Sequence, residues 1–425
     1  SFYYGIMFNL SNFWGAVHLW RISQEPFMAS AKWIDNLVVR ASYGLQGNID
    51  KNTSPFLLGN YRIENILPGG SEDMIDVSGA PNKKLRWEKT HSVNAGFDFA
   101  VLNQAINLSV DYYYRKGVDL IGTQMLPLET GFEMLTVNWA SMRNQGVEIA
   151  LSTRNVHTKN FMWTTNFNFA YNNNKVLKEA LREDALEPGR EGYPAGALFA
   201  LKTAGLDEEG YPMFQDKDGK AVSAMEFFKL QEWGFGATDL TARERRELYT
   251  YVGTADCPYT GGFNNTFTYK AFELGVNFSF DFGGKVRSQP TYSIVDFDKG
   301  RNTNRDILNR WTPENTETIF PVLLSQNERL DEYMWYSNQN EIYRNLDIWI
   351  RDLNYVRLQN IRLGYTLPTN FTRTLGMTSA TVAIEGRNLL VFGSSYKNYL
   401  DPETMSNAYA TPAPKSVTLS LNLIF

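Results

Sequence analysis

The stretch that decides the fold is Ser416–Phe425, which reads SVTLSLNLIF. Its odd-numbered positions are apolar, whereas its even-numbered positions are polar except for Ile424. Successive side chains of a β-strand point to opposite faces, so this stretch predicts a strand with one apolar and one polar face. The same pattern, about ten residues long each time, recurs along the whole chain, and that recurrence is typical of a transmembrane β-barrel.

Pairs of such segments predict antiparallel hairpins. Apolar residues alternate with polar ones from Val93 to Val101. After a polar link at 103–104, the alternation resumes from Ile106 to Tyr114. Two alternating runs around a short polar link indicate a tight hairpin.

A second feature of the strands is a shift in one of them. Within residues 351–366 the apolar phase moves by one position between Leu358 and Ile361. Such a slip predicts a β-bulge near Gln359. Counted together, the alternating segments predict an all-β chain of about eleven or twelve strands.

The connections between the predicted strands alternate in length. The short ones lie at residues 24–36, 103–104, 157–160, 270–271 and 367–378. The long ones lie at residues 48–92, 118–142, 174–260, 284–350 and 391–414. Outer-membrane barrels carry short periplasmic turns and long extracellular loops, whereas a soluble sandwich has no reason to sort its connections. The pattern favours a membrane barrel and puts Phe425 on the periplasmic side.

The composition restricts other classes of protein. The chain has 425 residues and a net charge of -5 with no long basic block, which argues against nucleic acid as a partner. Three histidines and one cysteine, scattered along the chain, do not provide a Cys/His zinc site, and we expect no cofactor. No apolar run approaches the ~18 residues of a transmembrane helix, but barrel strands need only ~9–11 residues to cross a bilayer.

The strand count and the first residues predict a partial barrel. The chain opens at Ser1, and residues 2–8 already read as a strand. An open sheet of this size would leave two unpaired edges in lipid, where backbone groups need partners. Barrels of about 22 strands have a plugged lumen. We therefore expect residues 1–425 to form the C-terminal part of a 22-stranded antiparallel barrel, completed by upstream sequence or by another chain.

An ordered set of short motifs resembles the C-terminal half of the SusC-like TonB-dependent transporters of Bacteroidetes outer membranes. The motifs of the first half are WRISQE at 20–25, DNL at 35–37, RASYG at 40–44, LRWEKT at 85–90 and NQGVE at 144–148. RWTPEN at 310–315, YVRLQN at 355–360, DPE at 401–403 and the final Phe425 follow in the family's order. Each motif alone is weak, but the ordered set is specific. The family's plug domain and TonB box have no counterpart within these residues.

The resemblance implies a function and a set of partners. A SusC-like barrel spans the outer membrane in contact with lipid and pairs with a SusD-like surface lipoprotein that closes over its mouth. It imports an oligosaccharide or oligopeptide with energy from TonB, which engages the N-terminal part. The resemblance also implies that the barrel-assembly machinery reads Phe425 as an assembly signal.

Two other interpretations stay open. One is a passive porin or adhesin barrel, which a plug domain and TonB box upstream would exclude. The other is a soluble all-β carbohydrate-binding protein, which would be released from membranes without detergent. An enzyme is not expected, because the chain has no G-x-S-x-G, P-loop or H-E-x-x-H motif.

One motif resembles a metal site. The sequence DKDG at 216–219 is similar to the start of a calcium-binding loop, which makes Asp216 and Asp218 weak candidate ligands. Position twelve, counted from Asp216, is Phe227 rather than the required Glu, so we expect no metal site. An Asp-Gly pair between apolar residues is better suited to closing a small extracellular hairpin.

Aromatic residues in the long connections are the candidate cargo contacts, because aromatic faces stack on sugar rings and pack against peptide side chains. The candidates are Trp233, Trp311, Trp335, Tyr336 and Tyr396. Each is also suited to packing, and Pro313 would stiffen the turn if Trp311 anchors its loop instead. These aromatics therefore predict a ligand surface without naming the ligand.

Overall fold

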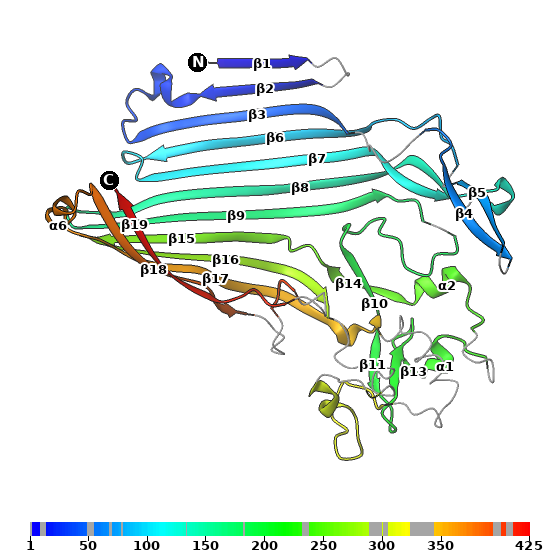
Figure 1. The fold of residues 1–425 in the computed structure, drawn as a ribbon. Helices are drawn as coiled ribbons and strands as arrows, with labels where there is room; N and C mark the ends of the chain where they lie inside the picture. Colours follow the sequence, from blue (N-terminus) through cyan, green and yellow to red (C-terminus); the bar gives the residue numbers. More distant parts are fainter. Residues whose placement is uncertain are drawn as a thin grey trace. The chain divides into compact units, whose positions relative to one another are not determined.

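A computed structural model describes residues 2–8, 14–48, 55–67, 70–77, 80–132, 134–181, 183–231, 238–288, 300, 305–323, 344–393, 401–404 and 411–425. The fold is all-β. Twelve strands belong to one sheet in the order β1-β2-β3-β6-β7-β8-β9-β15-β16-β17-β18-β19 (Figure 1). This number confirms the predicted strand count. The chain divides into two compact units.

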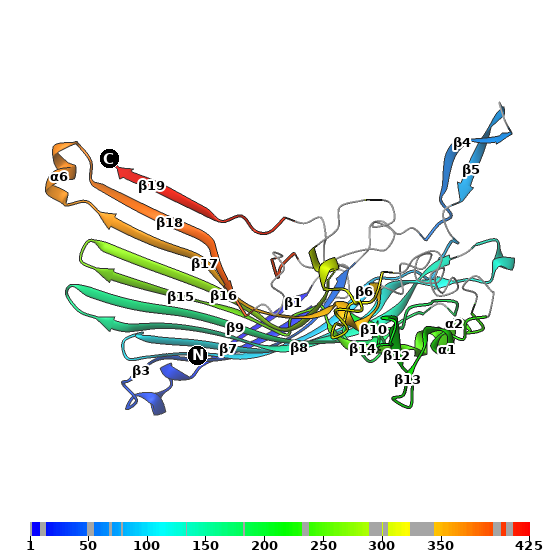
Figure 2. The same cartoon turned by 90° about the horizontal axis from the view of Figure 1, so that it is seen from below.

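The first unit comprises residues 1–156, 164–182 and 189–195. Its sheet strands are β1 (Phe2–Phe8), β2 (Trp14–Arg21), β3 (Ile34–Asn48), β6 (Glu88–Val101), β7 (Ile106–Met125), β8 (Met134–His157) and most of β9 (Phe161–Lys178). The connection after β3 forms a separate ribbon of β4 (Gly59–Leu67) and β5 (Gly70–Val77) (Figure 2). Short 3-10 helices occupy two further connections: η1 (Ile22–Gln24), η2 (Pro26–Met28) and η3 (Leu128–Thr130).

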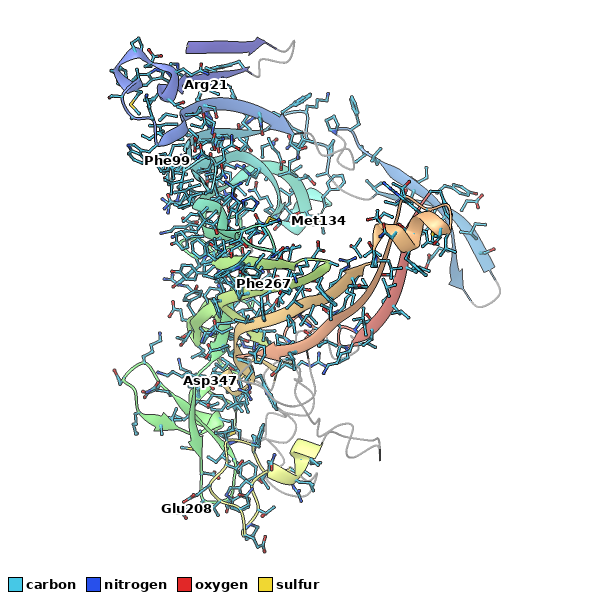
Figure 3. The ribbon with its side chains drawn as sticks, turned by 90° about the vertical axis from the view of Figure 1, so that its left-hand side faces the viewer. Arg21, Phe99, Met134, Glu208, Phe267 and Asp347 are labelled. Atoms are coloured by element: carbon cyan, nitrogen blue, oxygen red, sulfur yellow. The ribbon has the colours of Figure 1, made fainter. Side chains whose placement is uncertain are left out.

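Cross-strand pairing sorts the residues of the first unit onto two faces, because opposite residues of an antiparallel pair share a face. One row across the strands is apolar and contains Trp20, Val39, Phe97, Val110 and Ile149. The neighbouring row contains Arg40, Gly96, Asp111 and Glu148. The alternation predicted for β6 and β7 is confirmed, and Phe99, labelled in Figure 3, lies on the apolar face.

The second unit comprises residues 157–163, 183–188 and 196–425. Its sheet strands are β15 (Tyr259–Tyr269), β16 (Phe272–Arg287), β17 (Ile350–Thr366), β18 (Ser379–Phe392) and β19 (Ser416–Ile424). Its apolar row contains Phe267, Leu274, Leu363, Ile384 and Leu419. The adjacent row contains Thr266, Gly275, Arg362, Glu385 and Thr418. The stretch at 416–425 therefore forms the two-faced strand that its sequence predicts.

The predicted bulge in β17 is confirmed at Gln359. The register against both neighbouring strands skips this residue between Leu358 and Asn360. Gln359 donates instead from its side-chain amide to Ser279 Oγ at 2.7 Å. One extra residue keeps the apolar side chains before and after it on the same face.

Several predicted connections need correction. Those expected at 24–36, 48–92 and 174–260 span 22–33, 49–87 and 179–258 instead. Val101 pairs with Ile106, so the β6–β7 turn spans 102–105 rather than 103–104. The connection expected at 118–142 shrinks to 126–133, because β7 and β8 continue past the expected strand ends. A register shift after Gly117 breaks the alternation there, and the sequence pattern therefore reads as if the strand had ended.

The connections after β9 and after β16 fold together into what we call the loop domain. Its elements are β10 (Ala197–Leu201), β11 (Thr203–Leu206), β12 (Pro212–Gln215), β13 (Ala221–Val222), α1 (Ala224–Phe227), α2 (Ala242–Glu247), β14 (Tyr249–Thr254), η4 (Arg305–Asn309) and η5 (Asp347–Trp349). Another helix, α6 (Thr369–Thr374), lies in the short β17–β18 connection. No helix in the described part of the chain is long and apolar enough to cross a membrane.

Candidate functional site

The loop domain has a hydrophobic core of its own. Its buried members are Leu201, Tyr211, Phe214, Val222, Ala224, Phe227, Phe228, Leu346 and Trp349. Phe214 stacks on Phe227 with 4.8 Å between ring centroids, and Phe228 meets both rings edge-on. Aromatic pairs of this kind contribute ~0.5–1.5 kcal/mol beyond their burial. Because the core draws residues from both long connections, they form one ordered body.

Polar contacts fix the two connections to each other and to β16. Thr203 donates to Asp347 Oδ1 from its backbone N at 3.2 Å and from Oγ1 at 2.6 Å. Arg287, the last residue of β16, donates to the carbonyl oxygens of Phe199 and Arg344. Figure 3 labels Asp347 at this junction. The loop domain is therefore held at the long-loop end of its own sheet strands.

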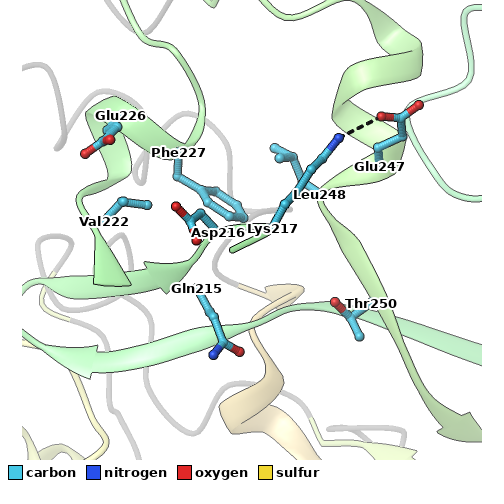
Figure 4. Close-up of a pocket in the computed structure, with 9 residues that line it drawn as sticks. All are labelled: Gln215, Asp216, Lys217, Val222, Glu226, Phe227, Glu247, Leu248 and Thr250. Atoms are coloured by element: carbon cyan, nitrogen blue, oxygen red, sulfur yellow. Dashed lines mark hydrogen bonds and ion pairs between the residues drawn. The ribbon is translucent and has the colours of Figure 1, made fainter. Parts of the chain in front are cut away.

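A pocket of about 250 Å³ lies in the loop domain (Figure 4). It is lined by Gln215, Asp216, Lys217, Val222, Glu226, Phe227, Glu247, Leu248 and Thr250. Lys217 donates to Glu247 Oε2 at 2.9 Å. Hydrogen bonds and charge from Lys217 and then Arg243 lower the pKa of Glu247, so it is ionised at neutral pH. The lining therefore combines an ion pair with the apolar groups of Phe227 and Leu248.

Trp311 is half-buried and packs against the backbone of Gly210. A Cβ added to Gly210 would lie 2.4 Å from Trp311 Cδ2, so only glycine allows this approach. Trp311 N also donates to Phe320 O at 3.0 Å. This placement suits a loop anchor, and contact with cargo stays a prediction. The other four aromatic candidates lie outside the described residues: Trp233, Trp335, Tyr336 and Tyr396.

The predicted hairpin at Asp216 is confirmed between β12 and β13. Asp216 Oδ1 accepts hydrogen bonds from the backbone N of Asp218 at 3.0 Å and of Lys220 at 2.7 Å. Gly219 has a φ of +81°, which suits this turn. The carboxylate of Asp216 thus closes the hairpin. Among the described residues, no group of three or more His, Cys, Asp or Glu side chains could hold a metal ion.

Arg40 organises a polar cluster on the polar face of the first unit. Its Nη2 donates to Asp98 Oδ1 at 3.0 Å, to Ser109 Oγ at 3.2 Å and to Asp111 Oδ2 at 3.0 Å. A Cβ at Gly96 would come within 2.2 Å of Asp111 Oδ1, so glycine leaves room for this carboxylate. Two carboxylates and a hydroxyl thus share one guanidinium group on this part of the polar face.

Arg357 clamps the β18–β19 connection onto the polar face of β17. Its side chain is 2% exposed and donates to Asp401 Oδ1, and to Glu403 Oε1 at 2.9 Å. Tyr355 donates to Asp281 Oδ2 at 2.5 Å and to Glu403 Oε1 at 3.2 Å. We call these five residues the Arg357 clamp.

Asp401 stays ionised although it is buried. Burial raises the pKa of its carboxyl, but hydrogen bonds from Arg357 and from the backbone N of Glu403 and Ala413 outweigh it, so the pKa is lowered. Breaking such a buried pair leaves an uncompensated charge. The sequence motifs YVRLQN and DPE contain the clamp residues, but their pairing across the fold was not predicted.

Comparison with known proteins identifies the family. The model of the family described as "TonB dependent receptor-like, beta-barrel" matches residues 14–297, more than half of the chain. The chain belongs to this family. The sheet of this receptor barrel is therefore part of an outer-membrane β-barrel, whose apolar face contacts lipid and whose polar face lines the lumen. The long connections are extracellular and the short turns periplasmic.

Relatives of this receptor barrel are longer proteins. TonB-dependent receptor P3 of Formosa agariphila is 26% identical over 96% of the chain, and TonB-dependent receptor SusC of Bacteroides thetaiotaomicron is 25% identical over 98%. The chain spans 41% and 40% of their lengths. The solved structure described as the RagAB peptide transporter matches with a TM-score of 0.73 and 23% identity, covering 97% of this chain and 43% of that one. This last likeness shows the shared fold.

Phe425 lies directly after β19 and its side chain is 82% exposed. β19 is an edge strand of the described sheet, and all of its residues are exposed. The role of Phe425 as an assembly signal stays a prediction.

Proposed function

We propose that this receptor barrel is part of a SusC-like importer that carries a nutrient oligomer, either an oligosaccharide or an oligopeptide, across the outer membrane with energy from TonB. A SusD-like surface lipoprotein would cover its extracellular mouth. Relatives named SusC and TonB-dependent receptor support this proposal. The solved relative described as a peptide transporter supports the same class of transport without selecting the cargo.

The observation that carries the proposal is the ordered loop domain. Connections longer than ~12–15 residues are uncommon in compact folds unless they have a function. Here two of them share a buried core around Phe214 and Trp349, and Arg287 holds them to β16. A passive pore has no need of such a body, whereas a mouth that meets a partner and a cargo does.

The pocket of the loop domain suits one residue of an oligomer. At about 250 Å³ it is smaller than the ~300–1,000 Å³ of typical drug-sized ligand sites. Its ion pair, Lys217 with Glu247, offers both charges to a polar group. Leu248 and Thr250 add apolar and hydroxyl contacts. A single sugar ring or a single amino-acid side chain meets these conditions equally well.

The test is to unfold the loop domain while keeping the barrel. Phe214→Asp in the full-length transporter places an unpaired charge in the core of the domain. Lys220→Ala changes an exposed residue of the same β12–β13 hairpin and serves as the matched control. The measurements are the outer-membrane level of the transporter, co-purification of the lipoprotein, and growth on the cognate nutrient.

We expect Phe214→Asp to keep the barrel in the outer membrane and to lose both the lipoprotein and growth, while Lys220→Ala behaves as the native protein. Normal growth and normal co-purification with an unfolded loop domain would remove the support for the proposal.

A further inference from the structure

A row of basic side chains crosses the lipid-facing side of the first unit. His91 on β6 pairs with Lys116 on β7, and Lys116 pairs with Arg143 on β8. The pairing of β6 with β7, and of β7 with β8, has no register shift between these residues and the short turns. Residues two apart in a strand share a face, so the row lies on the same side as Val110 and Phe97. His91, Lys116 and Arg143 therefore point away from the lumen.

Lys175 on β9 extends the row. Asn174 donates from Nδ2 to Asn144 Oδ1 at 2.6 Å, so these two residues of β9 and β8 meet on one face. Asn144 belongs to the polar face, because it is one residue from Arg143. Lys175 follows Asn174, and Arg143 precedes Asn144. Successive side chains of a strand point to opposite faces, so Lys175 and Arg143 both point to the lipid side.

The row lies at the height of the outer-leaflet headgroups. Lys116 is the eleventh residue of β7, counted from Ile106 at the periplasmic turn. A transmembrane strand uses ~9–11 residues to cross the hydrocarbon core. Tyr114 and Tyr43 lie one step closer to the turn on the same face, as expected of the aromatic girdle that marks the interface. The cations are thus placed just above the apolar band.

The row lacks compensating charge. Between the row and the turns, the lipid-facing positions of β6, β7 and β8 contain no Asp or Glu. Within the described part of the chain, no ion pair engages Lys116, Arg143 or Lys175. Arg143 Nε is buried without a hydrogen-bond partner. Asp119, three residues beyond Lys116, is already paired with Arg86 at 2.5 Å.

We propose that Lys116, Arg143 and Lys175 bind the phosphate of a phosphorylated lipid headgroup in the outer leaflet of the membrane. Clustered Lys and Arg side chains at the membrane surface attract anionic headgroups, and phosphate accepts charge-assisted hydrogen bonds from guanidinium and ammonium groups. The tyrosines below the row provide a surface for the less polar part of the same lipid. The site is annular, and it is independent of the import function proposed above.

The experiment is a lipid titration of the full-length transporter in neutral detergent. Fluorescent phosphatidic acid is the phosphate-bearing probe, and phosphatidylcholine is the zwitterionic reference. The test variant is Lys116→Gln, Arg143→Gln, Lys175→Gln in combination, with each single variant measured as well. The matched control is Arg115→Gln, because Arg115 neighbours Lys116 on β7 but points to the lumen. A further arm adds inorganic phosphate as a competitor.

We expect the native transporter to prefer phosphatidic acid and the triple variant to bind it about 100-fold more weakly, because each surface cation contributes roughly fivefold. Each single variant should lose about fivefold, which keeps the test valid if the triple variant fails to fold. Arg115→Gln should bind as the native protein does. Unchanged binding by the singles and the triple, an equal loss with Arg115→Gln, or full competition by millimolar inorganic phosphate would each overturn the proposal.

Discussion

Phe278 and Asn277 are adjacent on β16. The side chain of Phe278 faces lipid, and that of Asn277 faces the lumen. Phe278 stacks on Phe263 of β15 with ring centroids 4.8 Å apart, on the lipid side. Phe278→Arg should destabilise the barrel by ~2–4 kcal/mol, because an arginine near the bilayer midplane loses its hydration. Asn277→Arg, on the lumen side, should cost far less. Urea unfolding of the full-length transporter in lipid vesicles measures both, and equal losses would contradict the register.

A second single-residue prediction concerns Arg357, the buried cation of the Arg357 clamp. Arg357→Met leaves Asp401 and Glu403 without their cation and should destabilise this region by ~3–5 kcal/mol. Arg362→Met is the matched control on the same strand, because its ion pair with Glu273 is exposed and worth only ~0–1 kcal/mol. Limited proteolysis reports release of residues 401–404. If the two variants resist protease equally, the clamp does not hold the connection.

Among the elements, α2 has a cap whose strength depends on pH. Glu244 Oε2 accepts from Thr241 N at 2.9 Å, and Thr241 Oγ1 accepts from Glu244 N at 3.3 Å. The hydrogen bond from the backbone of Thr241, followed by those from its hydroxyl and from Lys229, lowers the pKa of Glu244 from 4.5 to about 2. Since the pKa is depressed in the folded state, the cap stabilises α2 fully above about pH 4.5 and is lost as the pH falls toward 2.

Hydrogen exchange of the α2 amide groups, corrected for intrinsic rates, measures this dependence. Protection should fall between pH 4.5 and 2 in the native transporter. In Glu244→Gln, which keeps an acceptor oxygen but cannot titrate, the slope should flatten. A slope that is the same in both proteins would show that Glu244 does not control the helix.

The strands could be predicted from the sequence because each one is two-sided. Alternation alone located β6, β7, β16 and β19, and the phase shift around Gln359 located the bulge. Local patterns failed where the backbone departs from regular pairing. The β6–β7 turn places Leu102, Asn103 and Gln104 at positive φ, a conformation that is uncommon for Leu and Gln.

The loop domain and the clamp could not be predicted because their contacts join distant segments. Phe214 and Trp349 share a core although 135 residues separate them in the chain. Arg357 meets Asp401 across a whole strand and a connection. The motifs YVRLQN and DPE contain Arg357 and Asp401, but their local sequence does not indicate that the two side chains pair.

At the scale of the whole molecule, the described sheet has β1 and β19 at its edges. An unpaired strand edge is not tolerated in lipid, so the proposed function must be measured in a protein that also contains the strands that close this sheet. The chain corresponds to about two fifths of relatives that are TonB-dependent receptors. The proposed importer would need energy from TonB, whereas a passive porin with the same barrel would not.

The most direct measurement is uptake of the cognate nutrient oligomer by intact cells with and without TonB, at equal outer-membrane levels of the transporter. Our account predicts that loss of TonB lowers uptake to the level of a strain that lacks the transporter. Uptake that continues unchanged without TonB, and still requires the transporter, would contradict active import and identify a passive pore.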